Sequence, residues 1–158
     1  MARRLGAAQA DLYAAEADSV DRLGVVWRRL ADARCHAGLL VGSDWFAERW
    51  PHFVECDVER RGSGSVWSTC LPLDDGGPEG RPTRGVVLLA DGGLRQPVLL
   101  HELAHLLNRP GAGHDRAFAA IHLTLVRHDM GFLAYAEYRR ALWARASFEG
   151  VDEAVVAR

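Results

Sequence analysis

The sequence predicts an α+β fold in a single domain spanning residues 1–158, with a small, mainly antiparallel sheet of about three strands packed against several helices. Short segments with strand patterns lie in the middle of the chain, and segments with helical apolar spacing lie on both sides of them. A chain of 158 residues has the size of one ordinary domain. Its 49% hydrophobic and 25% charged residues are typical of a globular protein.

The first third of the chain is predicted to be mainly helical. Apolar residues recur at three- and four-residue spacings through 8–33, which predicts one long amphipathic helix. The apolar segment 37–42 is expected to be a connector or a short strand. Ser43 or Asp44 can then cap a short helix, which Pro51 prevents from continuing.

Two strands are expected to follow as a hairpin. Apolar and acidic residues alternate in 54–61, the glycines of 62–64 make a turn, and 65–73 returns. This pairing would place Cys56 opposite Cys70. We expect two buried, reduced thiols, because the three cysteines form no CxxC pair and disulfides are rare in the cytosol.

The second half of the chain combines one strand with three helices. The turn-rich segment 74–85 is expected to be an exposed loop, and the continuous apolar run 85–91 a strand buried on both faces. Pro97 suits the first residue of the next helix. Two further helices are predicted at 114–128 and 134–147.

The helix that begins near Pro97 carries the sequence His101-Glu102-Leu103-Ala104-His105. Residues four apart project from one face of a helix, so His101 and His105 can bind one ion. A catalytic zinc ion takes three protein ligands and leaves a fourth position for water. Glu102 is turned away from the ligand axis and can act on that water as a general base. The motif therefore predicts a zinc site.

The third ligand is expected from the segment that follows a Pro-Gly stop. His114 lies nine residues beyond the motif, at the predicted start of the next helix. Glu137 is an alternative ligand, and Asp115 can bind directly or orient a ligand. His122 and His128 are further along the helix and are expected to be packing or surface residues.

HELAH followed by GHDRAF resembles the zinc-binding core of the SprT/Spartan-type zincins. Over nearly the whole length, the segments LYAAEAD, GSGS and VLLHELAH and the helix break at Met130-Gly131 resemble a family of small actinobacterial and mycobacteriophage proteins described as metallohydrolases. The resemblance implies a zincin-like fold, with His101, His105 and His114 as ligands. No cysteine-based zinc ribbon is present at the C-terminus.

These features favour a zinc-dependent hydrolase, and within that class a metallopeptidase acting on a peptide or protein. The strand at 85–91 is expected to line the cleft and to pair with an extended substrate backbone. Arg116, Tyr135 and Tyr138 are candidates for stabilising the transition state.

Two alternatives stay open. One is a non-catalytic, zinc-stabilised regulatory or interaction module, and the other is a SprT-like protease acting on DNA-bound proteins. The arginine groups at 28–29, 60–61 and 139–140 can supply a basic surface, although scattered charges are more often solvated faces. The net charge of −2 argues against a surface built entirely for nucleic acid. We expect no signal peptide, no membrane span and a cytoplasmic location.

Overall fold

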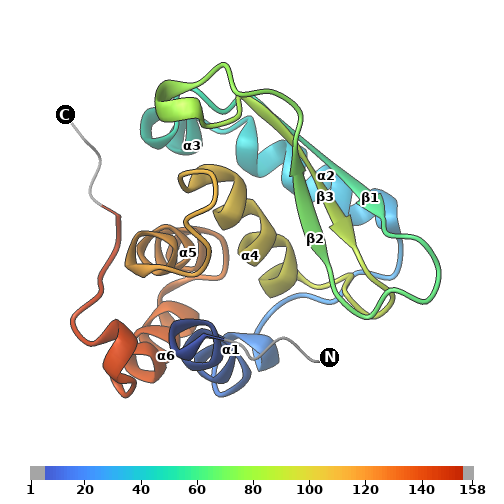
Figure 1. Cartoon of the computed structure of the whole chain (residues 1–158). Helices are drawn as coiled ribbons and strands as arrows, with labels where there is room; N and C mark the ends of the chain where they lie inside the picture. Colours follow the sequence, from blue (N-terminus) through green and yellow to red (C-terminus); the bar gives the residue numbers. More distant parts are fainter. Residues whose placement is uncertain (1–5, 155–158) are drawn as a thin grey trace. The chain divides into compact units, whose positions relative to one another are not determined.

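The computed structural model describes residues 6–154 and confirms the α+β class. Within this range, six α-helices accompany a three-stranded mixed sheet (Figure 1). The chain forms two compact units, Val25–Gly111 and the combination of residues up to Gly24 with Ala112–Ala154. The single domain remains a prediction. No helix in the described range is long and apolar enough to cross a membrane, and the cytoplasmic location also remains a prediction.

The unit Val25–Gly111 contains the sheet, in the order β1-β3-β2. Its strands are β1 (Glu55–Arg60), β2 (Thr69–Pro72) and β3 (Arg84–Leu89). Strand β3 lies between the other two, parallel to β1 and antiparallel to β2. The predicted hairpin of β1 and β2 is therefore wrong, because the later strand pairs with both.

The central place of β3 also changes what the cysteines and this strand can do. Cys56 pairs with Gly85 on one side of β3, and Cys70 pairs with Val87 on the other. Because β3 lies between β1 and β2, Cys56 and Cys70 are separated by two strand spacings of about 4.8 Å each. This separation exceeds the Cα–Cα distance of roughly 7 Å beyond which a disulfide cannot form. All three cysteines are free thiols. Cys56 and Cys70 are therefore reduced as expected, but they are half-buried rather than buried. The backbone of β3 is paired on both sides, so it cannot also pair with a substrate.

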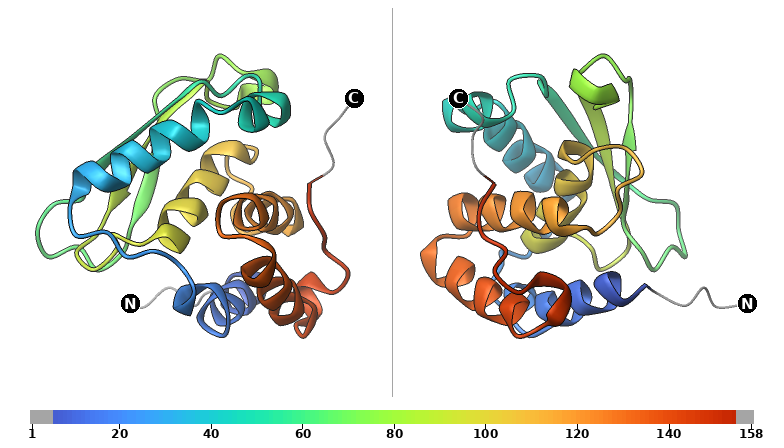
Figure 2. Two further views of the ribbon diagram at one scale, coloured as in Figure 1. Left: turned by 180° about the vertical axis from the view of Figure 1, so that it is seen from behind. Right: turned by 60° about the vertical axis from the view of Figure 1, so that its left-hand side comes forward.

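Only one face of β3 is fully buried, which corrects the expectation of two. Gly85, Val87 and Leu89 are buried, whereas Val86 and Leu88 between them are half-buried. Helices α2 (Leu30–Val41) and α4 (Gln96–Leu107) cover the buried face. Helix α2 packs mainly on β1, and α4 packs on β2 and β3 (Figure 2).

The contact between β3 and α4 depends on Gly85. A Cβ atom at this position would lie 2.6 Å from Cδ1 and 2.8 Å from Cδ2 of Leu106, well inside van der Waals contact. Leu106 is 2% exposed, so it has little room to move. The missing side chain of Gly85 therefore lets α4 approach the sheet closely.

The predicted long helix at 8–33 is wrong. The chain forms α1 (Ala7–Ala17) and then leaves the helix, and α2 begins only at Leu30. The break is held by long-range pairing, since Trp27 N–H donates to the Leu94 carbonyl at 2.8 Å and Val26 forms a bridge with Arg95. The apolar segment 37–42 belongs to α2 and its C-terminal end.

Short-range signals in this unit were predicted correctly. Helix α3 (Asp44–Arg49) is capped by Ser43, whose hydroxyl accepts a hydrogen bond from Phe46 N–H at 3.2 Å. Helix α4 begins at Gln96, one residue before Pro97, and ends at Leu107 with Asn108 as its C-cap.

The other unit is helical. Helices α5 (Arg116–Asp129) and α6 (Phe132–Trp143) pack together, and α1 packs against α6. The segment after α6 is tied to this unit because Asp152 accepts a hydrogen bond from the Tyr135 hydroxyl and Val151 accepts one from the Trp143 ring. Gly131, with φ of 89°, separates α5 from α6, as predicted.

We expect Gly85→Ala to lower the free energy of unfolding by about 1–3 kcal/mol, because the added methyl overpacks the contact with Leu106. Chemical denaturation of the purified protein measures the change. Gly38→Ala is the matched control, since its Cβ meets no atom within 4 Å and alanine favours the helix interior. Equal stability of the Gly85→Ala variant and the wild type would contradict the close packing.

Candidate metal centre

Helix α4 is an almost fully buried element, which explains its continuous apolar sequence. Ten of its twelve residues are buried, as is typical of a helix that is apolar on all sides. Its start is fixed by Gln96, whose backbone N–H donates to the Val25 carbonyl at 2.8 Å and whose side chain accepts from Val25 N–H at 3.1 Å. The helix thus holds its polar residues in a defined place.

His101, Glu102 and His105 lie on this helix as the motif predicts. The imidazole rings of His101 and His105 have centroids 5.0 Å apart and an interplanar angle of 68°. His101 and Glu102 are each 8% exposed, and His105 is half-buried. The two histidines therefore present their rings side by side, one helical turn apart.

His114 belongs to the other unit and lies two residues before α5. It follows a loop in which Gly111 and Gly113 have φ of 76° and 64°, a region that favours glycine. The His114 ring contacts the rings of Tyr13 and Phe118, with centroids 5.2 and 5.0 Å away. His114 does not belong to a helix, so its ring is oriented by these two aromatic contacts.

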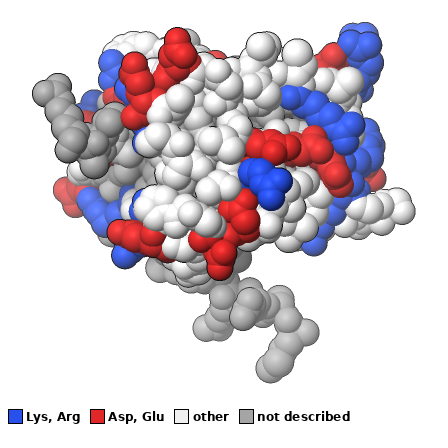
Figure 3. Space-filling view, turned by 90° about the horizontal axis from the view of Figure 1, so that it is seen from above, with Lys and Arg blue, Asp and Glu red and all other residues white. Residues whose placement is uncertain are grey.

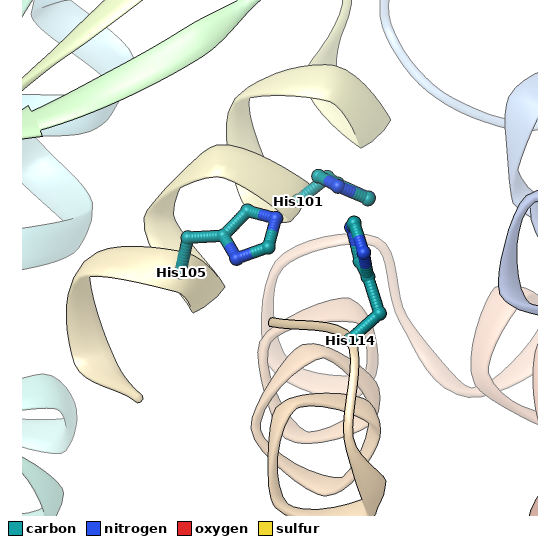
Figure 4. Close-up of side chains that lie close together, drawn as sticks. All are labelled: His101, His105 and His114. Atoms are coloured by element: carbon teal, nitrogen blue, oxygen red, sulfur yellow. The ribbon is translucent and has the colours of Figure 1, made fainter. Parts of the chain in front are cut away.

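The three predicted ligands form one group. One nitrogen from each of His101, His105 and His114 lies within 4.8 Å of the others, and the three rings lie close together (Figure 4). Bonds of about 2.05 Å to a tetrahedral ion require nitrogens roughly 3.4 Å apart, a separation within the 4.8 Å limit of this group. The group can hold a metal ion.

A second group with the same spacing consists of Glu16, His101 and His122. The pair of Glu16 and His122 was not foreseen. His122 is fully buried, and its Nδ1 lies 3.2 Å from Glu16 Oε1 and 2.9 Å from the Tyr138 hydroxyl. Glu16 and His122 lie within hydrogen-bonding distance of each other, and three imidazoles are a donor set that a catalytic zinc ion uses, so the three imidazoles are the better candidate for an ion.

The alternative ligands are engaged elsewhere. Asp115 caps α5 by accepting a hydrogen bond from Phe118 N–H at 2.8 Å, and Glu137 pairs with Arg140 at 2.8 Å. Neither belongs to the two groups found among residues 6–154. His128 is exposed, in keeping with the prediction of a packing or surface residue.

The three candidates for transition-state stabilisation have structural contacts. The guanidinium of Arg116 donates to the carbonyls of Ser147 and Glu149, at 3.2 and 2.8 Å. The Tyr135 hydroxyl donates to Asp152, and Tyr138 is fully buried beside His122. Burial raises the pKa of Tyr138 well above its usual value. These contacts assign the three residues to the packing of the helical unit.

Glu102 has a neighbour that the sequence did not reveal. Burial raises the pKa of the Cys70 thiol to about 12, and the negative charge of Glu102 adds to the increase. Burial also raises the pKa of Cys56 to about 12, with a smaller contribution from Asp57. Glu102 therefore lies where its charge acts on Cys70 of strand β2.

The proposed basic surface consists largely of paired arginines. Four of the six named arginines form ion pairs with carboxylates between 2.6 and 3.3 Å away. The pairs are Arg29–Asp32, Arg60–Asp91, Arg139–Asp152 and Arg140–Glu137. The face drawn in Figure 3 likewise shows acidic side chains beside basic ones. Binding of nucleic acid remains an untested prediction.

No protein-family profile, curated protein or solved structure matches this chain.

The reactivity of the cysteine thiols provides a test of the position of Glu102. At pH 8 a thiol with a pKa of about 12 is ionised in about one molecule in ten thousand, and the thiolate is the reactive form. We expect iodoacetamide to modify the exposed Cys35 first and to leave Cys56 and Cys70 intact, as followed by peptide mass spectrometry.

Glu102→Gln removes the charge beside Cys70, so it should lower the pKa of that thiol and accelerate its alkylation. Cys56 is the internal control, because its pKa is raised by burial and Asp57 rather than by Glu102. An equal acceleration at both cysteines would indicate a general loosening of the fold instead.

Proposed function

We propose that this protein is a zinc-dependent hydrolase and, within that class, a metallopeptidase. The observation that carries the proposal is the group of three imidazoles, two of them one turn apart on α4 and the third from the segment before α5. Glu102, next to the first histidine, supplies the carboxylate that hydrolysis needs.

The donor set fits zinc. Three neutral imidazoles suit a borderline-soft ion, and catalytic zinc sites use three protein ligands. Calcium and magnesium prefer oxygen ligands, which this group does not offer. When bound, zinc polarises a carbonyl and lowers the pKa of water to about 7.

Glu102 carries the proton transfers in this proposal. Its carboxylate accepts the proton of the attacking water and delivers it to the leaving amine, the role of a general acid–base residue. Its 8% exposure limits competing hydrogen bonds from bulk water. His101, His105 and His114 orient the reacting groups by holding the ion.

In this proposal an extended substrate adds to the outer edge of strand β2, which lies beside Glu102. It does not add to β3, because both sides of that strand are already paired. Leu73 N–H donates to the Arg84 carbonyl of β3 at 3.0 Å. Because hydrogen-bonding alternates along an antiparallel strand, the backbone groups of Cys70 and Pro72 point away from β3. Proline is tolerated where no N–H is needed for the sheet. A peptide can therefore add to this edge through the Cys70 N–H and carbonyl.

We expect wild-type protein purified without chelators to contain one zinc ion per chain, and His114→Ala to lose most of it. Glu102→Gln should keep the zinc and hydrolyse a mixed peptide library about 10²–10⁴-fold more slowly, because it lacks the base. Elemental analysis and mass spectrometry of the cleaved peptides provide the two measurements.

Glu137→Gln is the matched control, since this carboxylate pairs with Arg140 and should leave zinc content and hydrolysis unchanged. Undiminished hydrolysis by Glu102→Gln would remove this residue from its role. Zinc binding by a wild-type protein that cleaves no peptide would favour the non-catalytic module.

A further inference from the structure

Of the three histidines, His114 has the weakest support from the backbone. His101 and His105 are fixed by helix α4, whereas His114 directly follows Gly113, whose φ is 64°. Glycine loses more conformational freedom on ordering than any other residue. The direction of the His114 ring must therefore be set by side-chain contacts.

Tyr13 makes one of these contacts. Its ring lies edge-on to the His114 ring, with centroids 5.2 Å apart and an interplanar angle of 65°. Phe118 makes a similar contact with centroids 5.0 Å apart and an angle of 77°. Edge-to-face pairs at such distances are the favoured arrangement of aromatic rings. Tyr13 and Phe118 thus restrict the rotation of the imidazole.

Helix α1 gives Tyr13 a fixed position. Its neighbours Leu12 and Ala15 are fully buried, which anchors the helix in its unit. Asp11 accepts a hydrogen bond from Ser147 N–H at 3.3 Å, and Gln9 donates to the Tyr13 hydroxyl at 3.3 Å. The Tyr13 side chain is half-buried. Helix α1 fixes it at the backbone, and Gln9 contacts it at the hydroxyl.

We propose that the ring of Tyr13 is a positioning element for His114, which makes helix α1 part of the metal centre. This inference rests on the proposed function, because it takes His114 to be a zinc ligand. Residues that orient ligands typically change metal affinity by about 10–100-fold when they are replaced. The aromatic ring carries the effect, and the hydroxyl contributes little to zinc affinity.

The test compares Tyr13→Leu, which removes the ring and keeps apolar volume, with Tyr13→Phe, which keeps the ring and removes the hydroxyl. Zinc affinity is measured by competition with a chromophoric chelator. We expect about a tenfold loss of affinity for Tyr13→Leu and wild-type affinity for Tyr13→Phe. The Co²⁺-loaded proteins should differ in the same way, with an altered visible absorption spectrum only for Tyr13→Leu.

Two controls separate positioning from folding. Urea denaturation of the zinc-free variants reports any general loss of stability, which would leave the Co²⁺ spectrum of the folded protein unchanged. Gln9→Ala removes the hydrogen bond to the Tyr13 hydroxyl and should behave like Tyr13→Phe.

Wild-type affinity and spectrum in a folded Tyr13→Leu variant would overturn the inference. An equal loss in Tyr13→Phe would overturn it as well, because the hydroxyl would then carry the effect. Failure of the wild type to bind zinc would instead reject the proposed function, and this inference with it.

Discussion

The close approach of α4 to β3 is the contact on which the arrangement of the sheet-containing unit depends. It exists because Gly85 has no side chain where Leu106 packs. Burial of ten of the twelve residues of α4 fixes the rotation of the helix about its axis as well as its position. The directions of His101, Glu102 and His105 follow from that rotation, so a glycine on a strand helps to determine the geometry of a histidine pair.

Features encoded within a few residues could be predicted from the sequence. The spacing of His101 and His105, the Ser43 cap and the place of Pro97 each depend on local backbone geometry, and all three agree with the structure. The position of the third histidine depends instead on how the chain returns after a Pro-Gly stop. A His114 nitrogen lies within 4.8 Å of a nitrogen of each of the other two histidines, and its role as a ligand stays a prediction.

Features that depend on distant partners could not be predicted in this way. The helical spacing of 8–33 continues through a segment that the Trp27–Leu94 hydrogen bond and the Val26–Arg95 bridge hold out of the helix. The expected hairpin failed for a similar reason, since the turn at 62–64 is compatible with a later strand entering between its neighbours. Tyr13 and Cys70 carry no motif, and only tertiary structure reveals their contacts with His114 and Glu102.

The ligands consequently differ in what holds them. A metal ion gains little from further ordering of His101 and His105, because α4 has already restricted both rings, but binding to His114 must offset the freedom of a glycine-containing loop. Aromatic contacts with Tyr13 and Phe118 reduce that cost before the ion arrives. In the proposed zinc centre, the affinity for the ion would therefore depend on the residues around the third histidine as well as on the motif on α4.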